Sequence, residues 1–65
     1  MKPKDIGAKL SALRGGRSQA EVAEDIGISV SALSMYECGN RIPRDEIKLR
    51  IANYYGKSVS EIFFT

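Results

Sequence analysis

Glycines divide this 65-residue chain into short segments, and the segments that precede them carry apolar residues at helical spacing. Ile6, Leu10 and Leu13, for example, recur three or four residues apart, as the buried stripe of a helix requires. A glycine directly after such a stretch is typical of a helix C-terminus. The chain is therefore expected to fold into several short helices. The glycines at these boundaries are Gly15, Gly16, Gly27, Gly39 and Gly56.

Five helices are predicted when the residues that begin helices are considered together with these glycines. Ser18 and Ser58 are each followed three residues later by a glutamate, which is the pattern of a capping box. No segment alternates apolar and polar residues as a half-buried strand does, so the predicted fold class is all-α. The predicted helices cover residues 3–14, 19–26 and 30–38, a fourth segment from Asp45 to the residue before Gly56, and a brief fifth segment that carries Val59, Ile62 and Phe63.

The composition is that of an ordinary soluble domain, with 43% hydrophobic and 28% charged residues. Because the chain is short, residues 1–65 are expected to form a single domain. Its apolar runs of two or three residues are too short for a membrane span or a signal-peptide core. With one cysteine, Cys38, the chain can form no internal disulfide, and a reducing cytoplasm is the simplest location.

Motifs for catalysis and for metal binding are missing from the sequence. The chain has no histidine to act as a general base or zinc ligand, no Walker loop and no nucleophile elbow. We therefore expect neither enzymatic activity nor a metal or cofactor, and no small-molecule ligand is evident.

Charge is unevenly distributed along the chain, although the net charge is only +2. Basic residues outnumber acidic ones in residues 1–17 and 38–50, whereas every charged residue from 18 to 37 is acidic. Two basic blocks around an acidic one can form one electropositive surface in the folded chain, which favours a polyanionic partner. The alternative is that these charges are scattered and solvated.

The helices predicted for residues 19–26 and 30–38 are joined by only three residues, the first of which is Gly27. Two short helices with a glycine at the joint form a helix-turn-helix motif when they cross steeply. Ala23 is small enough to let the two backbones approach, and Leu33 and Tyr36 are spaced to face inward together. These placements predict a helix-turn-helix in the middle of the chain.

Residues 18–64, together with Leu13 and Arg14, resemble the Cro and phage-repressor type of helix-turn-helix domain, the XRE family. The resemblance implies a compact five-helix, lambda-repressor-like domain that binds double-stranded DNA as a homodimer. It further implies that the helix at 30–38 lies in the major groove, while the helix at 19–26 crosses the phosphate backbone. A salt bridge between Arg14 and Glu37 is also implied.

The resemblance assigns roles to particular residues of this chain. The positions implied to read bases are Val30, Ser31, Ser34 and Met35. Those implied to bind phosphates are Gln19, Asn40, Arg41 and Arg44. The base-reading positions depart from the bidentate Gln, Arg or Lys often found in the family, so direct readout is expected to be modest and supplemented by DNA shape.

Each of these assignments has a simpler alternative. The serines can be solvated helix residues, Met35 can fill the core, and Arg41 and Arg44 can be solvated loop charges. At the C-terminus, Ile62, Phe63 and Phe64 form a final apolar cluster. Some of these side chains are expected to pack inside and the remainder, including Phe64, to build a two-fold interface. Core packing alone is the alternative.

The leading interpretation is a repressor from a phage, mobile element or bacterial operon that binds a near-palindromic operator. The chain has no room for an inducer-binding domain, which favours repression. The rival interpretation is a protein-interaction module, such as an antitoxin-like or antirepressor-binding partner, that uses the same fold. The acidic middle segment and the weak base-reading positions permit this rival, and salt-sensitive DNA binding separates the two.

Overall fold

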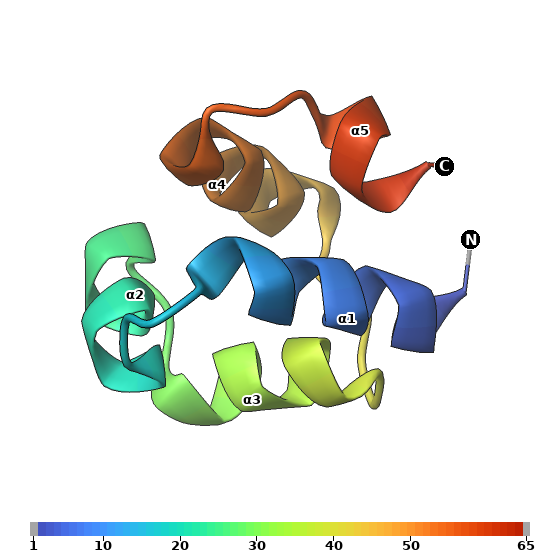
Figure 1. Ribbon diagram of the computed structural model, residues 1–65. Helices are drawn as coiled ribbons and strands as arrows, with labels where there is room; N and C mark the ends of the chain where they lie inside the picture. The colour runs from blue at the N-terminus through green and yellow to red at the C-terminus, as the bar shows by residue number, and fades with distance from the viewer. Residues whose placement is uncertain (1, 65) are drawn as a thin grey trace.

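The computed structural model describes residues 2–64, which form five helices (Figure 1). Their bounds agree with the sequence-based predictions, and the all-α fold class is confirmed. The helices are α1 (Pro3–Arg14), α2 (Gln19–Ile26), α3 (Val30–Cys38), α4 (Asp45–Tyr55) and α5 (Val59–Phe63).

α1 crosses the middle of the molecule, with α3 on one side and α4 and α5 on the other (Figure 1). α2 stands at the end of this arrangement where α1 finishes, and α5 lies near the first turn of α1 at the opposite end (Figure 1). α3 therefore packs against its neighbours through one side only. The other side forms the lower edge of the molecule in Figure 1.

Serine side chains begin three of the five helices. The hydroxyls of Ser18, Ser29 and Ser58 accept hydrogen bonds from backbone N–H groups at 3.0, 3.0 and 3.1 Å. Ser58 and Glu61 form a complete capping box, because the backbone N–H of Ser58 also donates to the Glu61 carboxylate at 2.9 Å. These bonds satisfy N–H groups that lack a partner within the helix, which is why the predicted starts agree with the structure.

The core is built from the apolar stripes of all five helices. Leu33 and Tyr36 face inward together, as predicted from their spacing, and Ala23 is buried where α2 meets α3. The buried hydrophobic residues are Ile6, Leu10, Val22, Ala23, Ile26, Leu33, Tyr36, Ile51, Ala52, Ile62 and Phe63.

Gly7 lies in the interior of α1, where sequence analysis assigned it no role. A methyl carbon at this position would overlap the backbone carbonyl of Glu37 and lie 2.9 Å from the carbonyl oxygen of Tyr36. The backbones of α1 and α3 therefore touch at Gly7, and a larger residue would push the two helices apart. Within residues 2–64, no helix is both long and apolar enough to cross a lipid bilayer.

Candidate nucleic-acid interface

The joint between α2 and α3 is a tight turn built on Gly27. Gly27 adopts φ 89° and ψ 35°, a left-handed conformation that a residue without a Cβ reaches at little cost. The N–H groups of Gly27 and Ile28 both donate to the carbonyl of Ala23, at 2.9 and 3.0 Å, and close the end of α2. Ser29 then caps α3, so the predicted joint between two separate helices is confirmed.

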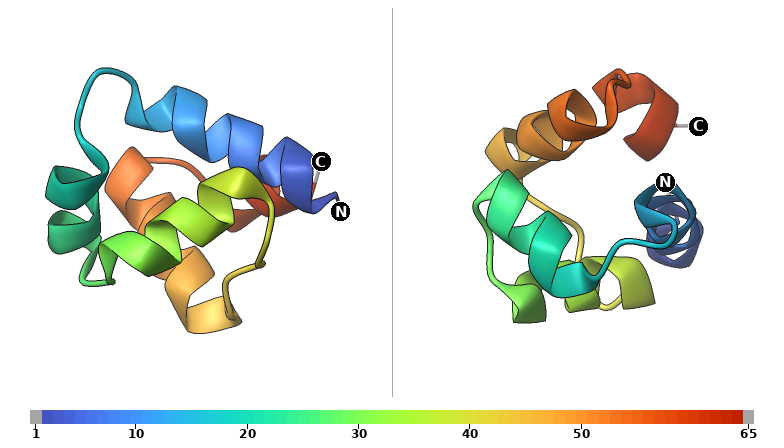
Figure 2. Two further views of the ribbon diagram at one scale, coloured as in Figure 1. Left: turned by 90° about the horizontal axis from the view of Figure 1, so that it is seen from below. Right: turned by 60° about the vertical axis from the view of Figure 1, so that its left-hand side comes forward.

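The outer side of α3 carries the four residues that were expected to read bases. Val30 and Met35 are 44% and 38% exposed, Ser31 is exposed and Ser34 is half-buried. The alternative that Met35 fills the core is therefore wrong. The view from below in Figure 2 looks onto this side of α3, which no other helix covers. The surface offers two hydroxyls and two apolar groups and no charge.

The loop from α3 to α4 carries the candidate phosphate-binding residues Asn40, Arg41 and Arg44. All three are exposed, and the buried Pro43 lies between the two arginines. Arg44 is the N-cap residue of α4, but its side chain makes no capping hydrogen bond. Neither arginine forms an ion pair within the described residues 2–64, so both guanidinium groups are available to an anion.

Gln19, the remaining candidate for phosphate binding, is half-buried at the start of α2. Its amide nitrogen donates to Glu37 at 3.0 Å, so the side chain is held against α3. The same carboxylate accepts from Nε and Nη2 of Arg14, at 2.8 and 3.0 Å, and the implied Arg14–Glu37 salt bridge is confirmed. The hydrogen bond to Glu37 is the main reason that the pKa of Arg14 is raised.

These bonds connect three helices at one carboxylate. Arg14 ends α1, Gln19 begins α2 and Glu37 lies in the last turn of α3. The network therefore fixes where the start of α2 stands relative to α3, the two elements that meet DNA in helix-turn-helix proteins. A phosphate contact by Gln19 stays a prediction.

A comparison with known protein families identifies the family to which this pair of helices belongs. The model of the helix-turn-helix family matches residues 10–62, from the middle of α1 to the last turn of α5. The chain belongs to the Cro and repressor type of helix-turn-helix proteins, the XRE family. It is a DNA-binding regulator, and its family is not one of enzymes. Searches of curated proteins and of solved structures found no match.

Several cations of the two basic blocks in this helix-turn-helix protein form contacts within its own fold. Lys48 is 8% exposed, with its ammonium 3.7 Å from Asp45 and 5.0 Å from the ring centre of Phe64. Arg50 pairs with Glu46 at 3.5 Å on the same helix. Only the arginines in the loop before α4 remain free, so residues 38–50 give a smaller basic surface than the sequence indicates.

In the first basic block, Arg17 is also engaged within the fold. It donates to the hydroxyl of Tyr54 and lies 5.0 Å from the centre of the tyrosine ring. That hydroxyl in turn donates to Asp25 at 2.9 Å. Burial, followed by this bond to Asp25, raises the pKa of Tyr54. Arg17 therefore fastens the loop after α1 to α4.

The C-terminal cluster divides between the core and the surface. Ile62 and Phe63 are 2% and 1% exposed, whereas Phe64 is 58% exposed. The interpretation of Ile62 and Phe63 as interface residues is corrected, because α5 turns both side chains into the core of the chain. Phe64 stays a candidate for the interface.

Like Phe64, Leu49 on α4 is an exposed apolar residue, and 56% of its surface is accessible. The sequence-based predictions included Phe64 but not Leu49. Both line a groove of about 310 Å³, together with Asp45, Lys48 and Val59. Leu49 lies between Ile47 and Ile51 in the sequence and so points away from their inward-facing stripe. An apolar residue outside the stripe was the signal that could have identified it.

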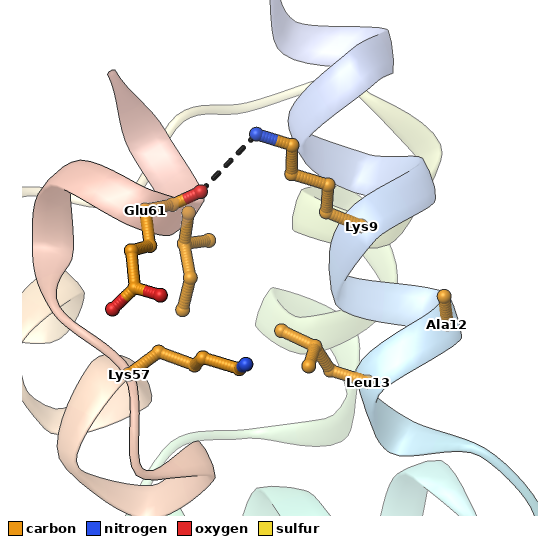
Figure 3. Close-up of a pocket in the computed structure, with 6 residues that line it drawn as sticks. Lys9, Ala12, Leu13, Lys57 and Glu61 are labelled. Atoms are coloured by element: carbon orange, nitrogen blue, oxygen red, sulfur yellow. Dashed lines mark hydrogen bonds between the residues drawn. The ribbon is translucent and has the colours of Figure 1, made fainter. Parts of the chain in front are cut away.

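A second hollow lies between α1 and α5, on the side of α1 away from α3 (Figure 3). Its volume is about 280 Å³, and Leu13 and Lys57 point into it from opposite sides. Lys9 closes one end by donating to the backbone carbonyl of Glu61 at 3.2 Å. Within residues 2–64, no group of three or more side chains is arranged to hold a metal ion.

Proposed function

We propose that this protein is a cytoplasmic transcriptional repressor that binds a near-palindromic operator as a homodimer, with α3 of each subunit in the major groove. The observation that carries the proposal is the exposed, uncharged outer side of α3, bordered by free arginines. In helix-turn-helix dimers, the two recognition helices enter successive major grooves about 34 Å apart. A dimer bound in this way over a promoter blocks polymerase.

The proposed base readout depends on short side chains. The hydroxyls of Ser31 and Ser34 can donate to or accept from base edges, while Val30 and Met35 can contact thymine methyl groups. None of these residues makes the bidentate contacts that discriminate bases most strongly. We therefore propose that sequence preference comes partly from the shape and flexibility of the operator.

The proposed affinity comes mainly from phosphate contacts outside α3. Asn40, Arg41 and Arg44 are exposed in the loop from α3 to α4, and Gln19 lies at the start of α2. With roughly two phosphates per subunit neutralised by Arg41 and Arg44 and about −0.9 per contact, the logarithm of a dimer's affinity falls against the logarithm of salt with a slope near −3.6. Such steep salt dependence distinguishes DNA binding from the rival role as a protein-interaction module.

Selection of duplexes from a random pool, followed by anisotropy titrations of the selected and random duplexes, tests the proposal. We expect Arg41→Ala to weaken binding to every duplex alike, because a phosphate contact carries no sequence information. Ser31→Ala and Ser34→Ala are expected to change the preferred base at one position of each half-site. Serine variants that leave the selected sequence unchanged would show that another surface reads the bases, and wild-type protein without salt-sensitive binding would favour the protein-interaction module.

The proposed dimer forms through the groove around Phe64 and Leu49. Two large apolar side chains that are more than half exposed on a small domain favour an interaction surface. Asp45 and Lys48, which carry opposite charges, line the same groove. A surface with both charges beside apolar groups can pair with a copy of itself across a two-fold axis.

Phe64→Asp is expected to convert the protein to a monomer, because each interface would then lose a large apolar side chain and bury a second carboxylate beside Asp45. Sedimentation equilibrium should give a mass of 7.2 kDa for this variant and twice that value for the wild type. Val30→Asp is the matched control, since it puts the same charge on the exposed side of α3 and should leave the dimer intact. An unchanged dimer in Phe64→Asp would exclude this groove as the interface.

A further inference from the structure

The cations of this protein fall into two groups according to their partners in the fold. Of its ten lysines and arginines, five are engaged through the contacts described above. These are Lys9, Arg14, Arg17, Lys48 and Arg50. The other five are exposed and form no hydrogen bond or ion pair within the part of the chain that the structure describes; they are Lys2, Lys4, Arg41, Arg44 and Lys57.

Lys4 lies against the end of α3, although 35 residues separate it from Gly39. A methyl carbon on Gly39 would lie 2.9 Å from both Cα and Cγ of Lys4. Gly39 is the C-cap of α3, and it is followed directly by Asn40 and Arg41. The first turn of α1 therefore stands beside the point where the candidate phosphate-binding loop begins.

The view from below in Figure 2 shows the consequence for the surface around α3. The first turn of α1 borders the C-terminal end of α3 on one side, and the loop that leads to α4 leaves it on the other. Lys4 lies in the first turn of α1, and Arg41 and Arg44 lie in the loop that leads to α4. Both segments that adjoin the end of α3 therefore carry free cations, while the outer side of α3 itself carries no charge.

This arrangement suits the sugar-phosphate backbone of a DNA duplex. A helix in the major groove has a phosphate backbone along each edge of the groove, which is about 12 Å wide. Because α3 has no lysine or arginine of its own, attraction to these phosphates must come from residues at its borders. Lys4 is a long side chain with no partner, placed at such a border.

We propose that Lys4, in the first turn of α1, is an additional phosphate-binding residue that acts with the loop after α3 on the DNA backbone. The proposal rests on the proposed function, in which α3 lies in the major groove. It extends the DNA-binding surface to a helix outside the helix-turn-helix motif. It also gives a role to the first basic block, most of whose other members are engaged in the fold.

Lys4→Gln tests the proposal in anisotropy titrations of the selected and random duplexes over a range of salt concentrations. The slope of log affinity against log salt should become shallower by about 0.9 per subunit, equally for both duplexes. Lys4→Arg should keep the wild-type slope because it keeps the charge. Lys57→Gln is the matched control, since Lys57 lies by the hollow between α1 and α5 (Figure 3) and should leave the slope unchanged.

The folded state should tolerate Lys4→Gln, because a cation in the first turn of a helix opposes the helix dipole. A circular dichroism melt that matches the wild type checks this point. If Arg41→Gln lowers the slope and Lys4→Gln does not, the role of Lys4 is wrong while the proposed function stands. If the wild type shows no salt-dependent DNA binding, the proposed function itself is wrong.

Discussion

Gly7→Ala is expected to destabilise this protein, although the same change stabilises an isolated helix by about 1 kcal/mol. The new methyl group would overlap the backbone carbonyl of Glu37, and a backbone atom cannot move away as a flexible side chain can. α1 and α3 would have to separate along their contact, an overpacking that costs typically 1–3 kcal/mol and occasionally more. We expect a net loss of about 2 kcal/mol, or a melting temperature lower by roughly 8–16 °C.

Gly16→Ala is the matched control for Gly7→Ala. Gly16 has no atom within 4 Å of the position that a methyl group would take. Its replacement should therefore leave the melting temperature unchanged or raise it slightly, because alanine restricts the unfolded chain. Thermal melts followed by circular dichroism measure both variants. A Gly7→Ala protein as stable as the wild type would mean that α1 and α3 do not touch here.

Phe63→Ala is expected to have the larger effect, with a loss of about 3–5 kcal/mol in the free energy of unfolding. The ring is 1% exposed, so its removal leaves a cavity in the core. A domain of this length has a total stability of only about 3–10 kcal/mol, so the variant should be partly or fully unfolded at room temperature. Urea titration at a fixed, low protein concentration measures the loss.

Phe64→Ala provides the comparison, because the same side chain is removed one residue later. Phe64 is 58% exposed and contacts the ammonium of Lys48 at 5.0 Å from the ring centre. Loss of such an exposed contact should cost less than about 1 kcal/mol. Phe63→Leu, which keeps much of the buried volume, should be intermediate. Equal losses at positions 63 and 64 would contradict the division of this cluster between core and surface.

The Gly7 contact also has a consequence for DNA binding. α1 packs against α3 at the backbone of Tyr36 and Glu37, and the carboxylate of Glu37 holds Arg14 and Gln19 at the same junction. A change that separates α1 from α3 would therefore move the start of α2 and the first turn of α1 relative to α3. Mutations in this buried junction should weaken DNA binding without altering a residue that meets DNA.

Local signals in the sequence were sufficient to predict the helices and the joint between α2 and α3. Ser29 caps α3 through a bond to a residue only three positions away, and Gly27 reverses the chain through its own backbone angles. The inward direction of Leu33 and Tyr36 follows in the same way from their spacing on one helix. Such features act within about one helical turn, so the residues that produce them are neighbours in the sequence.

The tertiary structure determined which charged and aromatic residues are engaged in the fold and which remain exposed. The two neighbouring phenylalanines, Phe63 and Phe64, differ in exposure because α5 docks on the core in one orientation. Lys48 is withdrawn from the basic surface because it packs beside their rings, whereas Lys4 reaches the end of α3 because Gly7 and Gly39 let α1 come close. Each outcome depends on how helices distant in sequence pack together. That packing is set by the summed fit of the whole core, which no short stretch of residues contains.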